Sequence, residues 1–338
     1  MEPDIKIFVS HRIDIESELV DNPLYVPVRC GAVFDDRNPM GIAGDDTGDN
    51  ISEKRLSFCE FTVQYWAWKN VQADYYGLCH YRRFLSFADK RFKTDEFNMV
   101  HAAELTPMAK RRYGLLNKRA IQSLIAECDA VTSEYAPVER IPLSKGKAAT
   151  VRELWDAHDG LFFEKKVIPR MFELIDRMAP EYSESAREYF AGNLHRGFNC
   201  FVLRRELFDR MCRFQFPIMN AIAASLDTSG YTQTMLRTPA FVGEMLYGIF
   251  FYHITTRENW RVQERQLVFF ANTSKIKSRW DLCKRYLWFY MDRALRFLAD
   301  PILPKGTRRR EIVKKILFAI TPLEPRGVAD YKGWEYKE

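Results

Sequence analysis

The stretch that decides the fold class is Ile5-Lys6-Ile7-Phe8-Val9, which is followed directly by Ser10-His11-Arg12. Its β-branched and aromatic side chains predict a short buried strand, and the polar residues after it predict a loop at the carboxyl end of that strand. A first strand that leads into a polar loop is typical of α/β domains that bind ligands at the carboxyl ends of their strands. The N-terminus therefore predicts a domain of this class.

Strands and helices alternate along the rest of the chain. This alternation predicts a mostly parallel sheet with helices on both faces, and 338 residues suffice for one large domain with a smaller appendage. Further strands are predicted at 24–28, 75–79, 130–132, 198–203 and 267–270, and helices at 53–69, 150–158, 164–178, 184–190, 206–224 and 242–254.

The C-terminal part of the chain is strongly basic. Residues 275–338 hold 16 Lys and Arg against 8 Asp and Glu, a net charge of +8, whereas the whole chain has a net charge of +6. An apolar, aromatic helix flanked by Arg and Lys is predicted at 279–298, ending before Pro301 and Pro304. The apolar face of this helix either packs on the body of the protein or lies on an anionic membrane surface. We therefore divide the chain into a body, 1–272, and a basic, aromatic-rich helical extension, 273–338.

Cysteine usage and hydropathy favour a cytoplasmic protein. The seven cysteines are scattered and form no Cys-x-x-Cys pair, which argues against a disulfide framework and a zinc site. The acidic start Met1-Glu2-Pro3-Asp4 does not resemble a signal peptide. No apolar run approaches the ~18 residues of a membrane span.

The strongest candidate site follows the strand predicted at 75–79. That strand leads directly into His80-Tyr81-Arg82-Arg83. Guanidinium groups match the oxygen atoms of phosphates, so two arginines and a histidine at the end of a strand suit a diphosphate. The alternative is that the arginines pair with surface carboxylates.

A second candidate is the acidic loop Gly41–Asn50, in which Asp45, Asp46 and Asp49 lie close together. Three carboxylates can hold Mg²⁺ or Mn²⁺, or they can bind the hydroxyls of a ribose or a sugar. A solvated turn before a helix capped by Ser52 is the simpler interpretation.

Several common signatures are absent from the sequence. Gly-x-Gly-x-x-Gly and Gly-x-x-x-x-Gly-Lys-[Ser/Thr] do not occur, which argues against a dinucleotide oxidoreductase and a P-loop ATPase. Neither the Gly-x-Ser-x-Gly elbow nor a His-Glu-x-x-His zinc motif is present.

The chain resembles a bacterial family that is catalogued as a domain of unknown function. This family is common in capsule and O-antigen gene clusters, and some members are regarded as galactofuranosyltransferases. The resemblance is dense over residues 5–85 and traceable to about 255. Its clearest parts are Lys6–His11, Thr47-Gly48-Asp49-Asn50-Ile51-Ser52, Cys59-Glu60, Tyr65-Trp66-Ala67-Trp68-Lys69-Asn70 and Gly77–Phe84.

The resemblance implies a GT-A-like, Rossmann-like α/β fold and a hexosyltransferase that uses a UDP-linked sugar. The expected acceptor is a lipid-linked oligosaccharide at the inner membrane surface. A GT-A fold usually carries an Asp-x-Asp metal motif at the end of a central strand, where this chain has His80-Tyr81-Arg82. We therefore expect cationic side chains to replace the metal, with no cofactor required. A Mg²⁺ or Mn²⁺ ion held by Asp45, Asp46 and Asp49 is the alternative.

Site roles follow from the residues and the resemblance together. Glu244, in an apolar stretch, is the expected base, with Asp46 as second candidate. The chain has Met245 where the family usually shows Arg, and this departure leaves Glu244 unaffected. The expected donor-binding residues are His11, Asp49, Asn50, His80, Arg82 and Arg83, and the residues expected to contact sugar or acceptor are Trp66, Asn199 and Arg237.

Three functions remain open at this point. The interpretation we prefer is a glycosyltransferase of capsule or O-antigen synthesis, cytoplasmic and peripherally attached to the inner membrane. A non-catalytic scaffold of a polysaccharide assembly complex would keep the basic extension and lack the site. Nucleic acid binding is disfavoured, because the excess positive charge lies in the extension and not on the body.

Overall fold

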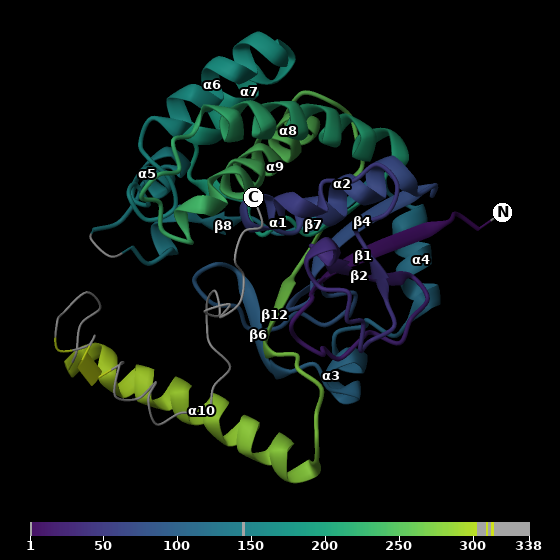
Figure 1. Cartoon of the computed structure of the whole chain (residues 1–338). Coiled ribbons are helices and arrows are strands. Elements are labelled where there is room, and N and C mark those ends of the chain that lie inside the picture. Colours follow the sequence, from purple (N-terminus) through teal and green to yellow (C-terminus); the bar gives the residue numbers. More distant parts are fainter. Residues whose placement is uncertain (1, 144–145, 303–308, 310–311, 314–338) are drawn as a thin grey trace.

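The computed structural model describes residues 2–143, 146–302, 309 and 312–313. In this part of the chain, helices pack around a ten-stranded sheet (Figure 1). The strands are β1 (Ile5–Arg12), β2 (Tyr25–Cys30), β3 (Ala43–Gly44), β4 (Tyr75–His80), β5 (Arg83–Leu85), β6 (Met99–Glu104), β7 (Ala130–Ser133), β10 (Phe201–Arg204), β11 (Val262–Arg265) and β12 (Leu267–Asn272), and the separate pair β8 (Ala136–Pro137) and β9 (Leu194–His195). The α-helices are α1 (Arg55–Phe58), α2 (Phe61–Asn70), α3 (Pro107–Arg112), α4 (Lys118–Ala126), α5 (Val151–Asp156), α6 (Val167–Met178), α7 (Ser183–Ala191), α8 (Arg205–Ser225), α9 (Thr238–Thr256) and α10 (Arg279–Ile302).

The main path of the sheet runs β11-β7-β10-β4-β1-β2-β3. Neighbouring strands on this path are parallel, except that β10 is antiparallel to both β4 and β7. The carboxyl ends of β1, β2, β4 and β7 therefore meet at one edge, together with the start of β10. This confirms the predicted mostly parallel sheet.

Of the strands that branch from this path, the sequence predicted β12, at 267–270, but not β5 or β6. β5 folds back on β4, with His80 opposite Arg83, and β12 joins β5 to β6. As a result, Arg83 turns back beside the carboxyl end of β4, next to His80.

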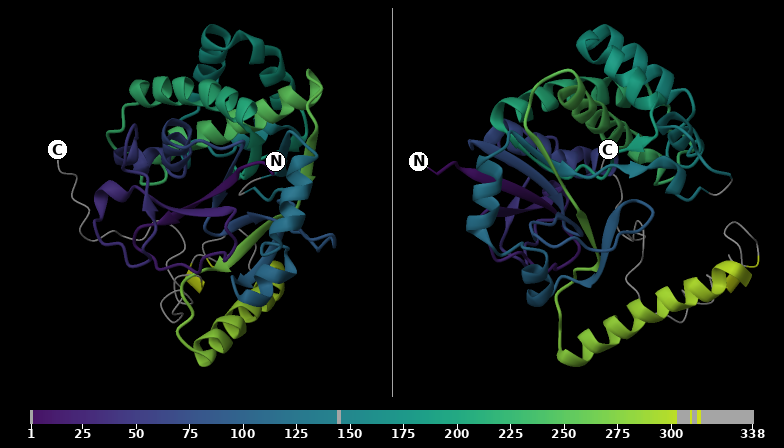
Figure 2. Two further views of the ribbon diagram at one scale, coloured as in Figure 1. Left: turned by 90° about the vertical axis from the view of Figure 1, so that its right-hand side faces the viewer. Right: turned by 180° about the vertical axis from the view of Figure 1, so that it is seen from behind.

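The side chains of β1 and β4 alternate between two apolar cores, as the pleat of a strand requires. Phe8, Tyr76 and Leu78 pack on the side of α2, α8 and α9. Ile7 and Cys79 pack on the other side, which is covered in part by α4. Figure 2 shows these helical layers on either side of the sheet. Both faces are buried, which explains why β1 and β4 are nearly continuous apolar runs.

The helix predicted at 53–69 is divided into two. Cys59 adopts φ 51° and ψ −131°, a backbone conformation that L side chains rarely adopt, so α1 ends before it and α2 begins after it. Ser52 does not cap a helix, because its hydroxyl donates to Asp45 at 2.5 Å. The strand predicted at 198–203 starts only at Phe201, since Phe198 (φ 71°) and Asn199 (φ 44°) are left-handed.

Helix α10 lies below the sheet as a separate rod and contacts β6 (Figures 1 and 2). Arg285 anchors it through an ion pair with buried Glu104, at 3.3 Å, and a hydrogen bond to the Ser274 carbonyl at 3.0 Å. The helix reaches Ile302, past Pro301, where the sequence predicted its end. The remaining basic segments of the predicted extension, at 303–308, 310–311 and 314–338, lie outside the described residues.

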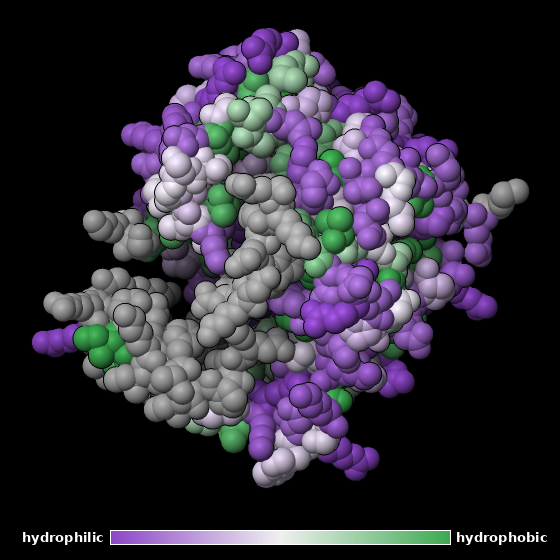
Figure 3. Space-filling view, in the orientation of Figure 1, coloured by the Kyte–Doolittle hydropathy of each residue, from purple (hydrophilic) through white to green (hydrophobic). Residues whose placement is uncertain are grey.

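Among the described residues, no helix combines the length and apolar character needed to cross a bilayer. On the face shown in Figure 3, hydrophilic residues predominate and hydrophobic ones form small separate patches.

Candidate active site

Charged and ionisable side chains from separate segments meet at the carboxyl edge of the sheet. Ser10 of β1 lies opposite His80 of β4, and the rings of the residues that follow them, His11 and Tyr81, are 6.4 Å apart. The positive charges of Arg83, Arg82 and Arg237 all act on His80. The predicted diphosphate residues therefore form one electrostatic cluster with His11 and Arg237.

Both histidines of the cluster are neutral at pH 7. Burial, followed by the charges of the neighbouring arginines, lowers the pKa of His80 well below its usual value. Its Nδ1 accepts a hydrogen bond from the backbone N–H of Arg82 at 3.4 Å, so the ring proton lies on Nε2. Burial also lowers the pKa of His11 to about 4. His80 thus offers a neutral N–H donor at this edge.

The two arginines of the turn are held against aromatic rings. The guanidinium of Arg83 lies over Phe198 at 4.8 Å and over Phe269 at 5.6 Å, and that of Arg82 lies over Phe269 at 5.4 Å. Burial lowers the pKa of Arg83. Among the described residues, the buried Nε atoms of both arginines lack a hydrogen-bond partner. Unused donors of this kind suit an anionic ligand with several oxygen atoms.

Glu244 of α9 lies beside this cationic cluster. Its Oε1 accepts a hydrogen bond from the backbone N–H of Phe198 at 2.9 Å. A side chain on Gly197 would come within 2.5 Å of Oε1, so the close approach requires glycine there. Burial raises the pKa of Glu244 above its usual value, although Arg83 opposes this. A carboxylate that is held by one oxygen and has a raised pKa has the properties of a general base.

Arg237 belongs to the cluster, and Asn199 directly follows Phe198, the residue whose ring lies under Arg83. Asn199 is buried, its Nδ2 donates to Gln64 at 3.4 Å, and its Oδ1 lacks a partner among the described residues. The Nε of Arg237 donates to Cys59 Sγ at 3.0 Å. Both are side chains that the sequence predicted to contact sugar or acceptor.

The acidic loop does not form the three-carboxylate metal site that was the alternative. Asp45 is fully buried, and it accepts hydrogen bonds from the backbone N–H groups of Gly31 and Ala32 and from the hydroxyls of Ser52 and Thr62. Asp46 and Asp49 are exposed instead. In the part of the chain that the structure describes, no group of three His, Cys, Asp or Glu side chains is placed to hold a metal ion. Asp45 is therefore a structural residue that ties the loop to η1 (Ala32–Phe34) and η2 (Ser52–Lys54).

Two other predicted site residues, Trp66 and Asp49, hold this loop against α2, and a third, Asn50, bonds to Ser52 just before it. The indole N–H of Trp66 donates to Thr47 at 2.9 Å, and its ring meets Phe8 edge-on. Asp49 accepts from the hydroxyl of Tyr65 at 3.1 Å, and Asn50 accepts from the backbone N–H of Ser52 at 3.2 Å. The described contacts tie none of these three to the arginine cluster. Their roles in binding the nucleotide or the sugar remain predictions.

Sequence reasoning assigned no role to two charged residues near the site. Glu60 follows the backbone break at Cys59, and its charge acts on Arg83, Arg237 and Glu244. In the sequence, Glu60 stood out only as part of the Cys59-Glu60 pair of the family resemblance. That pair by itself did not indicate a chemical role.

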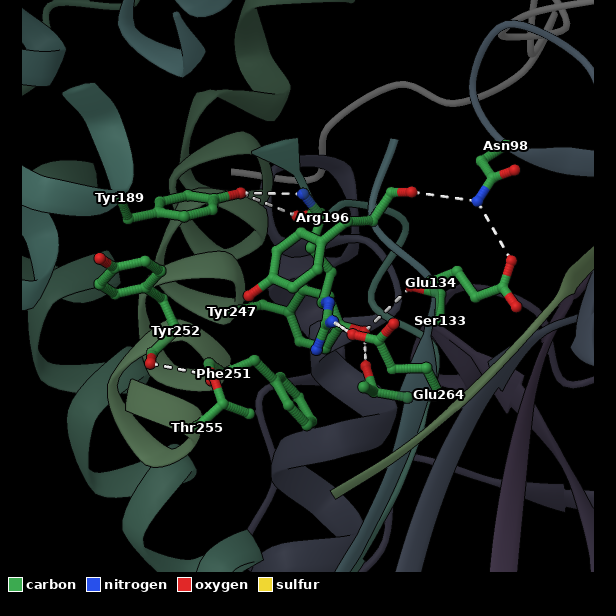
Figure 4. Close-up of polar contacts among 12 residues, drawn as sticks. Asn98, Ser133, Glu134, Tyr189, Arg196, Tyr247, Phe251, Tyr252, Thr255 and Glu264 are labelled. Atoms are coloured by element: carbon green, nitrogen blue, oxygen red, sulfur yellow. Dashed lines mark hydrogen bonds and ion pairs between the residues drawn. The ribbon is translucent and has the colours of Figure 1, made fainter. Parts of the chain in front are cut away.

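The second residue is Arg196, which is fully buried (Figure 4). Its guanidinium stacks on Tyr135 at 3.7 Å and pairs with Glu264, and its backbone N–H donates to the Tyr189 hydroxyl at 3.0 Å. Arg196 directly precedes Gly197 and Phe198, so it fixes the segment that orients Glu244. A lone Arg between two predicted elements gave no signal of this role.

Comparisons with known proteins agree with this architecture. The chain resembles the solved apo structure of the WbbM bifunctional glycosyltransferase, with a TM-score of 0.72 and 25% identity over 81% of this chain. The match spans 46% of that longer chain. The similarity confirms the predicted GT-A-like α/β fold. No curated protein sequence matches. The model of the family described as "Domain of unknown function (DUF4422)" matches residues 6–256, and the chain therefore belongs to this family.

Proposed function

We propose that the protein is a glycosyltransferase that moves a sugar from a nucleoside diphosphate donor to an acceptor hydroxyl. The observation that carries this proposal is the cluster of Arg82, Arg83 and His80, in which both arginines have an unused donor. Phe198 links this cluster to Glu244, because its ring lies under Arg83 and its backbone N–H donates to the Glu244 carboxylate. The similarity to a solved structure titled as a bifunctional glycosyltransferase supports it.

The cluster would stabilise the leaving group. In the transfer, the bond between the sugar C1 and the diphosphate oxygen breaks, and negative charge grows on the diphosphate. The guanidinium groups of Arg82 and Arg83 and the Nε2–H of His80 would donate to this charge, and preorganised donors of this kind lower the barrier most effectively. These side chains would supply the positive charge that a metal ion supplies in other transferases, so we propose that no metal is required.

Glu244 would act as the base. As the bond from the acceptor oxygen to C1 forms, the hydroxyl proton passes to the carboxylate of Glu244. The hydrogen bond from Phe198 fixes Oε1 and leaves Oε2 to take this proton. Asp46, the second candidate, lies on the exposed loop.

The finer assignments rest on the family resemblance. They are a UDP-linked donor, possible use of galactofuranose, and a lipid-linked acceptor of capsule or O-antigen synthesis. Helix α10 supports a membrane-surface location, because Trp280, Leu287 and Tyr290 are at least 60% exposed on it, with Lys284 and Arg293 nearby. Aromatic and basic residues together favour the interface of an anionic bilayer.

The first prediction concerns nucleotide binding. UDP should raise the melting temperature of the purified protein more than GDP, CMP or dTDP, and EDTA should leave the shift intact. At 100 times its dissociation constant a ligand adds about 2.7 kcal/mol to the free energy of unfolding, which thermal-shift measurements resolve. Loss of the shift in EDTA would contradict a metal-free site. Absence of any nucleotide shift would favour the non-catalytic scaffold.

The second prediction concerns α10. Replacing Trp280, Leu287 and Tyr290 together by Ser should abolish co-sedimentation with vesicles that contain anionic phosphatidylglycerol, because the variant removes the apolar surface that enters the interface. The variant should keep the wild-type melting temperature, since these side chains are exposed. Replacing exposed Met108 and Leu161 on the body by Ser is the matched control, and it should leave vesicle binding unchanged. Equal vesicle binding by wild type and the α10 variant would rule out this role for the helix.

A further inference from the structure

A single buried hydroxyl, that of Tyr189 in α7, holds the segment that leads to Glu244. Its oxygen accepts a hydrogen bond from the backbone N–H of Arg196 at 3.0 Å, and it donates to the carbonyl of the same residue at 3.2 Å (Figure 4). The Nδ1 atom of His195 lies 3.4 Å from the same oxygen. The hydroxyl therefore contacts two consecutive residues of this segment.

Two residues further along, the same segment binds Glu244. The backbone N–H of Phe198 donates to Oε1 at 2.9 Å. Gly197 lies between these two anchors, and a Cβ on it would come within 2.5 Å of Glu244 Oε1 and 2.7 Å of His195 Nε2. The carboxylate and the imidazole therefore crowd the same side of Gly197. A shift of this segment would displace the N–H that holds the carboxylate.

The hydroxyl and the carboxylate are placed one turn apart along the same helix. A Cβ on Gly248 of α9 would overlap the Tyr189 oxygen, so the hydroxyl lies directly against the helix there. Glu244 precedes Gly248 by four residues, which places the two on one face of α9. The segment 195–198 thus spans two points that one helix fixes, and close packing leaves it little freedom to adjust.

A buried hydroxyl that binds backbone groups can also serve stability alone, and Tyr76 provides the comparison. Its oxygen accepts from the N–H of Ala73 at 3.0 Å and donates to the carbonyl of Val71 at 2.8 Å. These contacts lie at the amino end of β4, at the opposite edge of the sheet from the arginine cluster. Tyr189 differs from Tyr76 because the segment that it holds ends on the Glu244 carboxylate.

We propose that Tyr189 is a positioning residue for sugar transfer, and that its hydroxyl sets the place of the Glu244 carboxylate through the segment 195–198. This inference rests on the proposed function. Without the hydroxyl, the N–H and C=O of Arg196 lose the partner that they have among the described residues, and the segment must move to find others. The Phe198 N–H then leaves Oε1, and the carboxylate is no longer held where it meets the acceptor hydroxyl.

The test compares Tyr189→Phe with Tyr76→Phe, each of which removes one buried oxygen and keeps the ring. Both variants should melt a few degrees below the wild type, because each leaves a backbone N–H and C=O without its partner. Only Tyr189→Phe should lower kcat, by about 10–100-fold, as expected for a reacting group that is slightly misplaced. The KM for the donor should change little, since Arg82 and Arg83 also rest on Phe269.

The pH profile supplies a readout that loss of stability alone does not move. The rise of kcat/KM with pH, its acid limb, reports ionisation of the base. The Phe198 hydrogen bond lowers the pKa of Glu244, so its loss should move the limb of Tyr189→Phe to higher pH by roughly 0.5–1.5 units. Tyr76→Phe should keep the wild-type limb. Both variants retain the other charged or titratable groups around Glu244, which are Arg83 of β5, Glu60 before α2, Arg237 of η5 (Met235–Arg237), and His195.

A measurement without turnover separates this inference from the proposed function. Carboxyl ¹³C NMR of protein labelled in its glutamate side chains gives the pKa of Glu244, and Glu244→Gln identifies the resonance. If the wild type transfers sugar but folded Tyr189→Phe keeps its kcat and its Glu244 pKa, the positioning role is wrong and the proposed function stands. If this pKa rises in Tyr189→Phe but the wild type neither binds a nucleoside diphosphate nor transfers sugar, the hydroxyl does set the place of the carboxylate and the proposed function is wrong.

Gly248→Ala decides the question if Tyr189→Phe does not fold. Alanine favours a helix more than glycine does, which supports folding of this variant. Its Cβ must displace the Tyr189 hydroxyl from α9. A raised Glu244 pKa with reduced kcat would support the proposal, and wild-type values of both in folded Gly248→Ala would overturn it.

Discussion

Glu244→Gln should lower kcat of sugar transfer by about 10²–10⁴-fold, which is the usual contribution of a general base. Glutamine has the shape of glutamate, and its carbonyl oxygen can still accept the hydrogen bond from Phe198. The variant should therefore fold with a melting temperature close to that of the wild type. Nucleotide binding should be retained or become tighter, since negative charge leaves the site. The effect on kcat would then report the missing base and not a missing ligand.

The pH profile gives this prediction a second readout. Burial raises the pKa of Glu244 above its usual value, and the base is active only when ionised. Wild-type kcat/KM should therefore rise with pH through this raised pKa. This rise, the acid limb of the pH profile, should be absent from the residual activity of Glu244→Gln. Glu206→Gln, which changes an exposed carboxylate in the first turn of α8, is the matched control and should retain both rate and limb. A Glu244→Gln protein with wild-type rate would eliminate Glu244 as the base and make Asp46→Asn the next variant to measure.

The sequence predicts the part of the fold that local pattern controls. β1 and β4 are short apolar runs buried on both faces, so both strands were correctly predicted. β1 nevertheless continues through Ser10-His11-Arg12, which the sequence assigned to a loop. β6, with the sequence Met-Val-His-Ala-Ala-Glu, has few β-branched residues and was missed. It is a strand because its backbone pairs with β12, and that partner is more than 160 residues away in the sequence.

Features that depend on tertiary contacts could not be predicted. Asp45 looks like a candidate ligand beside Asp46 and Asp49, yet the fold turns it inward onto backbone N–H groups. The helix is interrupted at Cys59, although the residues around it favour a continuous helix. Only the tertiary structure, in which Arg237 donates to Cys59, shows this interruption and the position of Glu60 after it. Glu244 was chosen as the candidate base because an acidic residue within an apolar stretch is conspicuous in the sequence itself, and this role remains a proposal.

Arg83→Ala should lower kcat by about 10²–10³-fold, the range observed when one preorganised donor to a developing negative charge is removed. Arg83 is the expected residue for this role because its guanidinium is buried over Phe198 and Phe269 and its Nε has no partner among the described residues. Arg83→Lys should recover part of the loss, since it restores the charge but not the planar fork that matches phosphate oxygens. UDP affinity should fall in the same order, from wild type to Lys to Ala.

The same variant also tests whether Arg83 and Glu244 belong to one site. Arg83 lowers the pKa of Glu244 in the wild type, so its removal should raise that pKa further and move the acid limb of kcat/KM to higher pH. General loss of stability would lower the rate without moving the acid limb in this direction. Arg111→Ala, on the exposed surface of α3, is the matched control and should change neither rate nor limb. If Arg83→Ala keeps wild-type UDP affinity and an unshifted limb, the diphosphate does not bind at the end of β4, and the donor site must be sought elsewhere on the carboxyl edge of the sheet.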